Sequence, residues 1–200
     1  MDTLFIVYSY FFLYNLLSII YILYLNLEGY IYMKTRNLVL NGLMIALVCI
    51  ATMIIQIPTP GTNGFVNIGD SVIFITSILF GPVPGMIAGG IGSALADVLS
   101  GYSHWALFTL IIKGAEGYIV GSIVKNNSSL IKSIIASTIG AIVMVFGYFI
   151  AGAILKGSFL VSAGSIPSNM VQGGVSIVIG VLLANSLQHV NALKSVNFRS

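Results

Sequence analysis

Long apolar stretches separated by short polar segments run through most of the chain. From position 38 onward, six of them follow one another: Leu38–Ile57, Phe65–Phe80, Gly85–Leu99, Trp105–Val124, Ile131–Leu155 and Ile166–Leu187. About 20 helical residues cross the hydrocarbon core of a bilayer. The pattern therefore predicts an all-α integral membrane protein with six transmembrane core helices. The second and third stretches are short, which requires tilt or an irregular start.

A further apolar stretch precedes these six and differs from them in composition. Residues 3–27 carry no charge, are rich in Tyr, Phe, Leu and Ile, and contain almost no small residues. Met33-Lys34-Thr35-Arg36 then looks like a natural start with a basic flank. We expect residues 1–32 to be either an extra lipid-facing helix or an upstream-start artefact. Residues 33–190 then form the six-helix substrate-binding domain and residues 191–200 a cytoplasmic tail.

The composition identifies the solvent as lipid. Hydrophobic residues make up 58% of the chain and charged residues 6%, whereas a soluble domain has about 25% charged residues. This excludes a soluble enzyme, a nucleic-acid binder and a disordered chain. The single cysteine, Cys49, allows no internal disulfide and no cysteine-based zinc site. No Walker, GxSxG or HExxH motif is present, so neither an enzyme nor a bound cofactor is predicted.

The basic residues predict the topology. If the first core helix starts in the cytoplasm, only Lys156 lies in an outer loop, because Lys113 is inside a helix. Inner segments hold the other basic residues: Lys34, Arg36, Lys125, Lys132, Lys194 and Arg199. Cytoplasmic loops carry an excess of Lys and Arg. Both core termini are therefore expected in the cytoplasm, in a multi-pass protein of a bacterial-type plasma membrane.

That orientation brings polar residues from several helices and their connections into the outer half of the membrane. Ionisable groups in lipid are costly and usually face a cavity or one another. Their gathering at one depth predicts an outward-facing pocket for a polar ligand. The candidate residues are Asn67, Asp70, Asp97, Tyr102, His104, Trp105, Thr109, Lys113, Tyr148, Asn169 and Gln172.

Purely structural roles are open for several of these residues. Asp97 and Lys113 could form an ion pair between the third and fourth helices. Lys113 could instead pair with Glu116, three residues further along the same helix. Asp70 could cap the start of its helix. The two aromatic residues of the outer turn could simply mark the membrane interface.

Small residues recur at helical spacing. Such residues allow the backbones of two helices to approach closely. Within the third and fourth helices, we interpret the pattern as tight internal packing. On the first helix, Gly42 and Ala46 are equally consistent with a surface for a partner protein. The stripes of the third and fourth helices comprise Gly85, Gly89, Ser93, Asp97, Gly117 and Gly121.

A string of short motifs spans the second, third and fourth helices. It resembles the substrate-binding S components of energy-coupling factor (ECF) vitamin transporters, and most closely the group of hydroxymethylpyrimidine and vitamin B6 binders, sometimes labelled riboflavin-type. The resemblance extends over residues 33–187. The motifs are Asn67-Ile-Gly-Asp70, Gly81-Pro-Val-Pro-Gly85, Gly89-Gly-Ile-Gly-Ser-Ala-Leu-Ala-Asp97, Ser100-Gly-Tyr102 and Thr109-Leu-Ile-Ile-Lys113-Gly114.

The resemblance implies a binding subunit of an ATP-driven importer. Such a subunit captures a vitamin from outside in a pocket closed by the loop between the first two core helices, here Pro58–Asn67. It then docks on a transmembrane coupling subunit with two ATPases, and Gly42 and Ala46 are the candidate docking residues. A small, flat, hydroxylated heteroaromatic ring suits the polar and aromatic candidates. Vitamin B6 is the favoured ligand. The alternatives are hydroxymethylpyrimidine, riboflavin, or a small transporter that works by itself.

The topology leads to a first prediction. Single cysteines placed at Asn126 and at Ser158 should react with a membrane-impermeant reagent from opposite sides of the membrane, because the fifth core helix separates them. The measurement is labelling of intact cells against inverted vesicles. Reaction of both positions from one side would contradict the six-helix topology.

Overall fold

The computed structural model describes residues 35–59, 64–126 and 128–190. The chain divides into two compact units, residues 1–40 and residues 41–200. The apolar segment 1–32 and the tail 191–200 lie outside the described residues. The role predicted for each of them therefore stays a prediction.

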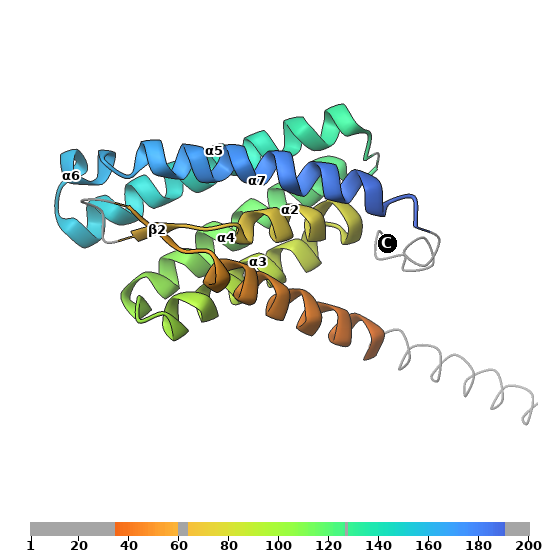
Figure 1. Cartoon of the computed structure of the whole chain (residues 1–200), viewed down its shortest axis with the longest axis horizontal. Helices are drawn as coiled ribbons and strands as arrows, with labels where there is room; N and C mark the ends of the chain where they lie inside the picture. Colours follow the sequence, from red (N-terminus) through yellow and green to blue (C-terminus); the bar gives the residue numbers. More distant parts are fainter. Residues whose placement is uncertain (1–34, 60–63, 127, 191–200) are drawn as a thin grey trace, which may run out of the picture. The chain divides into compact units, whose positions relative to one another are not determined.

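The described part of the chain is almost entirely helical (Figure 1). The helices Thr35–Ile54, α3, α4, α5 and the combined stretch Phe159–Leu187 are long and apolar enough to cross a membrane. The 12-residue α2 is shorter, as its apolar pattern predicted. After the helix Thr35–Ile54, the order is β1 (Ile57–Thr59), β2 (Gly64–Val66), α2 (Gly69–Phe80), α3 (Pro82–Leu99), α4 (Ser103–Val124), α5 (Leu130–Lys156), α6 (Phe159–Ala163) and α7 (Ile166–Leu187).

Two connections differ from the predicted pattern. A short antiparallel hairpin precedes α2, with Ile57 paired with Val66, so α2 begins at Gly69 rather than near Phe65. Hydropathy alone cannot separate a three-residue strand from a helix extension. The Ser/Gly-rich stretch before α7 contains the single-turn α6, where the Ser158 side chain accepts a hydrogen bond from the Val161 N–H.

Glycines with positive φ end the helices at two sharp turns. Gly81, with φ of 98°, separates α2 from α3, and Pro82 then starts α3, where its missing N–H costs nothing. Gly101, with φ of 84°, lies in the tight turn between α3 and α4. These turns fold α2, α3 and α4 back on one another as antiparallel neighbours.

The α3–α4 interface is a seam of touching backbones. A Cβ atom on Gly117 would overlap the Gly85 backbone, one on Gly89 would lie 2.6 Å from the Lys113 carbonyl oxygen, and one on Gly121 would lie 2.5 Å from Pro82 Cα. These distances are too short for a side chain to fit. The prediction of tight internal packing between these two helices is therefore confirmed.

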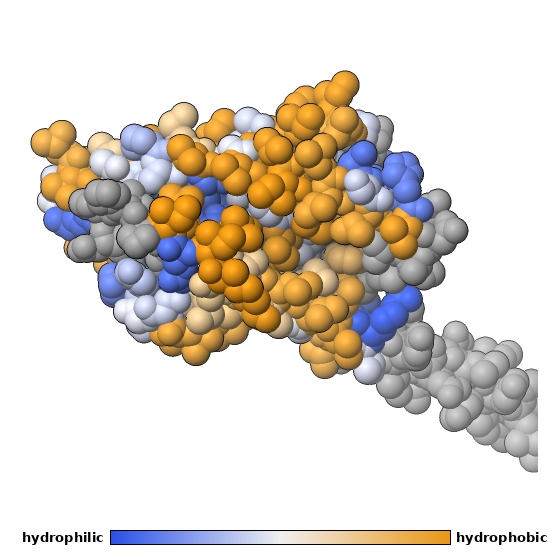
Figure 2. Space-filling model, viewed as in Figure 1, coloured by the Kyte–Doolittle hydropathy of each residue, from blue (hydrophilic) through white to orange (hydrophobic). Residues whose placement is uncertain are grey.

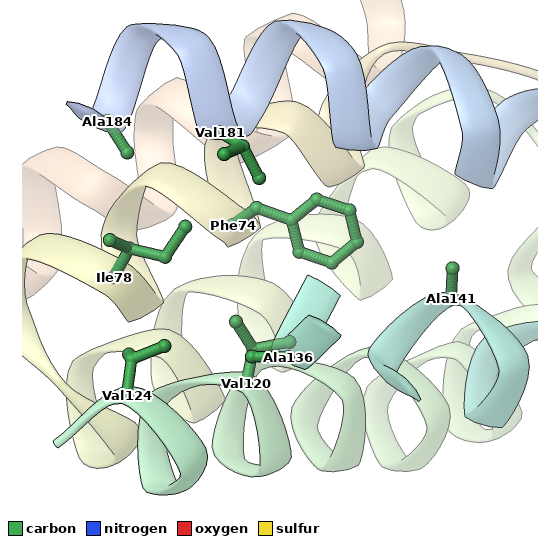
Figure 3. Packing of buried hydrophobic residues seen from close by; sticks show 8 residues of the cluster. All are labelled: Phe74, Ile78, Val120, Val124, Ala136, Ala141, Val181 and Ala184. Carbon is green, nitrogen blue, oxygen red and sulfur yellow. The ribbon is translucent and has the colours of Figure 1, made fainter. Parts of the chain in front are cut away.

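An apolar cluster fills the space between α2, α4, α5 and α7 (Figure 3). Phe74 at its centre is completely buried, and Gly180 lets α7 approach the backbone of α2 beside it. The cluster comprises Phe74, Ile78, Val120, Val124, Ala136, Ala141, Val181 and Ala184.

The outward faces of the same helices are also apolar. Ile111 on α4, Ile131 on α5 and Leu182 on α7 expose 63%, 72% and 58% of their surface. Figure 2 shows a broad apolar area across the middle of the visible face. Large side chains exposed in such numbers are stable against lipid tails rather than water.

The seam leads to a prediction about glycine substitutions. Gly117→Ala should destabilise the bundle by about 1–3 kcal/mol, because the added methyl group has no space and must push α3 and α4 apart. Thermal unfolding in detergent measures the effect. Gly174→Ala on α7 is the matched control, since nothing lies within 4 Å of its Cβ position and it should unfold like the parent protein. Equal stability of both variants would show that the seam is not close-packed.

Candidate functional site

Lys113 occupies the centre of the site. It is the eleventh residue of the 22-residue α4 and only 2% exposed, so its ammonium lies deep within the bundle. Its Nζ donates hydrogen bonds to Asp70 Oδ1 on α2 and, at 3.0 Å, to Glu116 Oε2 on α4. The Lys113–Glu116 pairing considered from the sequence is thus present. A buried charge is tolerated when it is paired and hydrogen-bonded in this way.

The Asp97–Lys113 pair that the sequence allowed does not form. Gly85 faces Gly117, and Gly89 faces Lys113, across the α3–α4 seam. Asp97 lies beside Thr109, one turn before Lys113 on α4. Lys113 instead forms an ion pair with Asp70 of α2. Its carboxylate pairs with Lys113, so the capping role that the sequence also allowed is wrong, and the helix start at Ile68 has no side-chain cap.

Gln172 connects this ion pair to the end of the hairpin. Its Nε2 donates to Asp70 Oδ2 at 2.9 Å, and its Oε1 accepts from the Asn67 backbone N–H at 3.0 Å. The Asn67 side chain in turn accepts from the Gly69 N–H at 2.8 Å. A continuous polar network therefore joins the segment after β2 to α2, α4 and α7.

Aromatic side chains form the other side of the site. The Tyr148 hydroxyl on α5 donates to Thr109 Oγ1 at 3.1 Å, and Lys113 Nζ lies 5.5 Å from the centre of the Tyr148 ring. Trp105 meets the same ring edge-on, with centroids 6.0 Å apart. The Tyr148 ring thus contacts the charged network at one face and an indole at its edge, a favourable geometry for both pairs.

Asp97 is a buried carboxylate with spare bonding capacity. It is 7% exposed, and among the described residues no hydrogen-bond partner reaches its Oδ2. Thr109, Lys113 and His104 lie close enough to interact with it electrostatically. A buried acceptor without a partner is costly, so it marks a position where a further donor would be stabilised.

The remaining candidates lie around this centre. His104 is exposed, with its ring 6.4 Å from that of Tyr102 and 6.1 Å from that of Trp105. Asn169 is half-buried on α7, one turn before Gln172. Two residues outside the candidate set also matter: Glu116, which is completely buried, and Gln56, which donates to Ser100 Oγ at 2.9 Å. In the sequence, the three-residue spacing from Lys113 pointed to Glu116, whereas no sequence feature pointed to Gln56.

The arrangement suits binding rather than catalysis or metal chemistry. Within the described ranges, no group of three His, Cys, Asp or Glu side chains could hold a metal ion. The site instead combines aromatic rings, a free carboxylate oxygen, hydroxyls and a fixed ammonium. Such a mixture orients a small polar ring and supports its faces.

Comparison with known proteins assigns the family. The sequence profile of the family described as "ECF-type riboflavin transporter, S component" matches residues 32–189, which is most of the chain. The chain is an ECF-type S component. The family resemblance is therefore confirmed, and with it the assignment as a membrane transport subunit rather than an enzyme.

The chain is also similar to individual proteins. A protein from Pyrococcus woesei, described as uncharacterized, is 40% identical over 143 residues, covering 72% of this chain and 93% of that one. The thiamine precursor transporter HmpT of Lactococcus lactis is 31% identical over 153 residues, covering 76% and 85%. A solved S component of a bacterial ECF transporter matches with a TM-score of 0.61 at 23% identity, covering 78% and 96%. This structural match confirms the S-component fold.

The ion pair leads to a prediction for this S component. Lys113→Met should destabilise the protein by about 3–5 kcal/mol, because Asp70 and Glu116 lose their cation inside the bundle. The double variant Lys113→Met/Asp70→Asn should recover much of that loss. Unfolding of the ligand-free protein in detergent gives both values.

The control for this cycle is Lys113→Met/Asp97→Asn. Since Asp97 makes no ion pair with Lys113, that double variant should recover less than the Asp70 one. Recovery with Asp97 and not with Asp70 would refute the observed pairing.

Proposed function

We propose that this S component captures a small hydroxylated heteroaromatic ring, a thiamine precursor of the hydroxymethylpyrimidine type, from outside the cell. The proposal rests on Asp97 Oδ2, which has no hydrogen-bond partner among the described residues. It lies in a buried region beside Thr109, on the α3–α4 hairpin that also bears Trp105. An aminopyrimidine presents N–H donors at its edge and two apolar faces, so it can donate to the carboxylate while the rings support it.

Vitamin B6, which the sequence favoured, is the second candidate. Pyridoxine also offers hydroxyl donors to Asp97 and Thr109 and a flat ring to Trp105. The pyrimidine ranks first because a relative that covers most of this chain transports a thiamine precursor. Riboflavin ranks third, because its three-ring system needs a larger pocket.

The proposed ligand contacts divide into two groups. Asp97, Thr109, Trp105 and Tyr148 surround the ring, and Lys113 retains one ammonium proton beyond those given to Asp70 and Glu116. The other candidates hold or border this position. They are Asn67, Asp70 and Gln172 on the network side, and Tyr102, His104 and Asn169 around it.

The binding proposal predicts that substitution of Asp97 lowers the affinity for the ligand. Asp97→Asn should weaken binding of the pyrimidine about ten- to a hundredfold, because an amide cannot match the charged acceptor, worth about 1.5–3 kcal/mol. Isothermal titration of the purified chain with hydroxymethylpyrimidine, pyridoxine and riboflavin gives the order of ligands and the effect of the variant. Ser122→Ala, at an exposed position of α4, is the control and should bind like the parent.

Two results would contradict this proposal. Parental affinity in Asp97→Asn would remove this residue from the site. Tighter binding of pyridoxine than of the pyrimidine would instead reinstate vitamin B6 as the ligand. Either result leaves the S-component assignment intact.

The orientation proposed for the site follows the basic residues. Lys125 follows the last residue of α4, and Lys132 lies in the first turn of α5, so both lie at the end of α4 opposite the turn that carries Tyr102. With this basic end in the cytoplasm of a plasma membrane, the aromatic side of the site faces outward.

The proposed partners are a transmembrane coupling subunit and two ATPases. Gly42 and Ala46 are both exposed, and nothing described lies within 4 Å of a Cβ on Gly42. These small residues are therefore not used for packing inside the bundle. A close helix–helix contact with the coupling subunit is the role that we propose for them.

The docking proposal predicts separate effects on transport and binding. Gly42→Leu or Ala46→Leu should abolish ATP-dependent uptake by the reconstituted transporter while leaving ligand affinity unchanged, because the leucine blocks backbone approach only at the outer surface. Gly174→Leu, also exposed and without neighbours, is the control and should transport normally. Concentrative uptake by the isolated chain would contradict the need for partners and favour a transporter that works by itself.

A further inference from the structure

Glu116 is a completely buried carboxyl group that the proposed binding site does not use. It lies one turn beyond Lys113 on α4 and is 0% exposed. Its aliphatic Cγ lies beside the apolar cluster: a Cβ on Gly140 of α5 would lie 3.5 Å both from Glu116 Cγ and from the Phe74 ring. Among the described residues, its Oε1 has no hydrogen-bond partner.

The two carboxyl groups that share Lys113 are held very differently. Asp70 accepts a hydrogen bond at each oxygen, from the Lys113 ammonium and from the Gln172 amide. It also lies in the first turn of α2, where the helix dipole favours a negative charge. Glu116 has only the Lys113 contact at Oε2. Asp70 therefore has a donor at each of its two oxygens, whereas Glu116 has a single donor for both.

The net charge of the cluster around Lys113 also argues against two ionised carboxylates. The cluster contains one ammonium and two carboxyl groups, in the interior of a helical bundle. The other titratable groups that face it are Tyr148 from α5, whose hydroxyl is neutral at ordinary pH, and Asp97 from α3, which adds no positive charge. α7 contributes the uncharged Gln172. Two ionised carboxylates would leave an excess negative charge in a medium that solvates it poorly.

We propose that Glu116 is a proton-binding site, which holds its proton at neutral pH as an un-ionised acid. The proton resides on Oε1, and Oε2 accepts the hydrogen bond from Lys113. The Asp70–Lys113–Glu116 cluster then has no net charge. This assignment goes beyond the proposed ligand and does not depend on which ring is bound.

Infrared difference spectroscopy of the full chain in lipid nanodiscs tests the proposal. The parent protein at neutral pH should show the carbonyl stretch of an un-ionised carboxyl group, and Glu116→Gln should lack it. Asp97→Asn is the matched control for a buried carboxyl group on the neighbouring helix, and it should keep the band. Because glutamine has the shape of the protonated acid, Glu116→Gln should also unfold at the temperature of the parent.

A second variant tests the charge argument itself. In Asp70→Asn, Glu116 becomes the carboxyl group that must balance Lys113, so it should ionise and its carbonyl band should disappear. Loss of an ionised carboxylate band in Glu116→Gln, in place of the carbonyl band, would overturn the proposal. Persistence of the Glu116 band in Asp70→Asn would overturn its electrostatic cause. If Asp70→Asn does not fold, the comparison of parent and Glu116→Gln decides alone.

Discussion

The hydrogen bonds of one buried ammonium group hold together the polar interior of this protein. Lys113 lies in the middle of α4, yet its charge is neutralised by Asp70 at the start of α2. Gln172 of α7 completes the carboxylate's bonding and holds the backbone at Asn67. In a bundle surrounded by lipid, no water is available to hydrogen-bond these groups. The network therefore fixes α2, α4 and α7, and the end of the hairpin, in one arrangement.

This arrangement requires helices that approach unusually closely. Lys113 faces Gly89 across the α3–α4 seam, and Gly180 brings α7 against the backbone of α2. The apolar cluster around Phe74 then fills the space between α2, α4, α5 and α7 (Figure 3). Because lipid tails are as apolar as leucine, burial of side chains alone gives little preference for one packing over another. Glycine contacts and polar partners supply that preference.

The polar interior serves two different purposes. Towards the α3–α4 turn, Asp97 retains an oxygen without a hydrogen-bond partner among the described residues, and we propose that a ligand binds there. Towards the middle of the membrane, Asp70 and Lys113 satisfy one another, and the proton proposed for Glu116 leaves that end neutral.

The sequence by itself determined the solvent, the helix count and the family, because hydropathy and motif spacing are local properties of the chain. The short α2 and the glycine seam followed from the same local patterns. The sequence did not determine which carboxylate would meet Lys113: it offered Asp97 and Glu116 as partners and suggested only a capping role for Asp70. Only the tertiary structure decided it. The α3–α4 packing places Asp97 beside Thr109, one turn before Lys113, and the packing of α2 against α4 brings Asp70 to the ammonium.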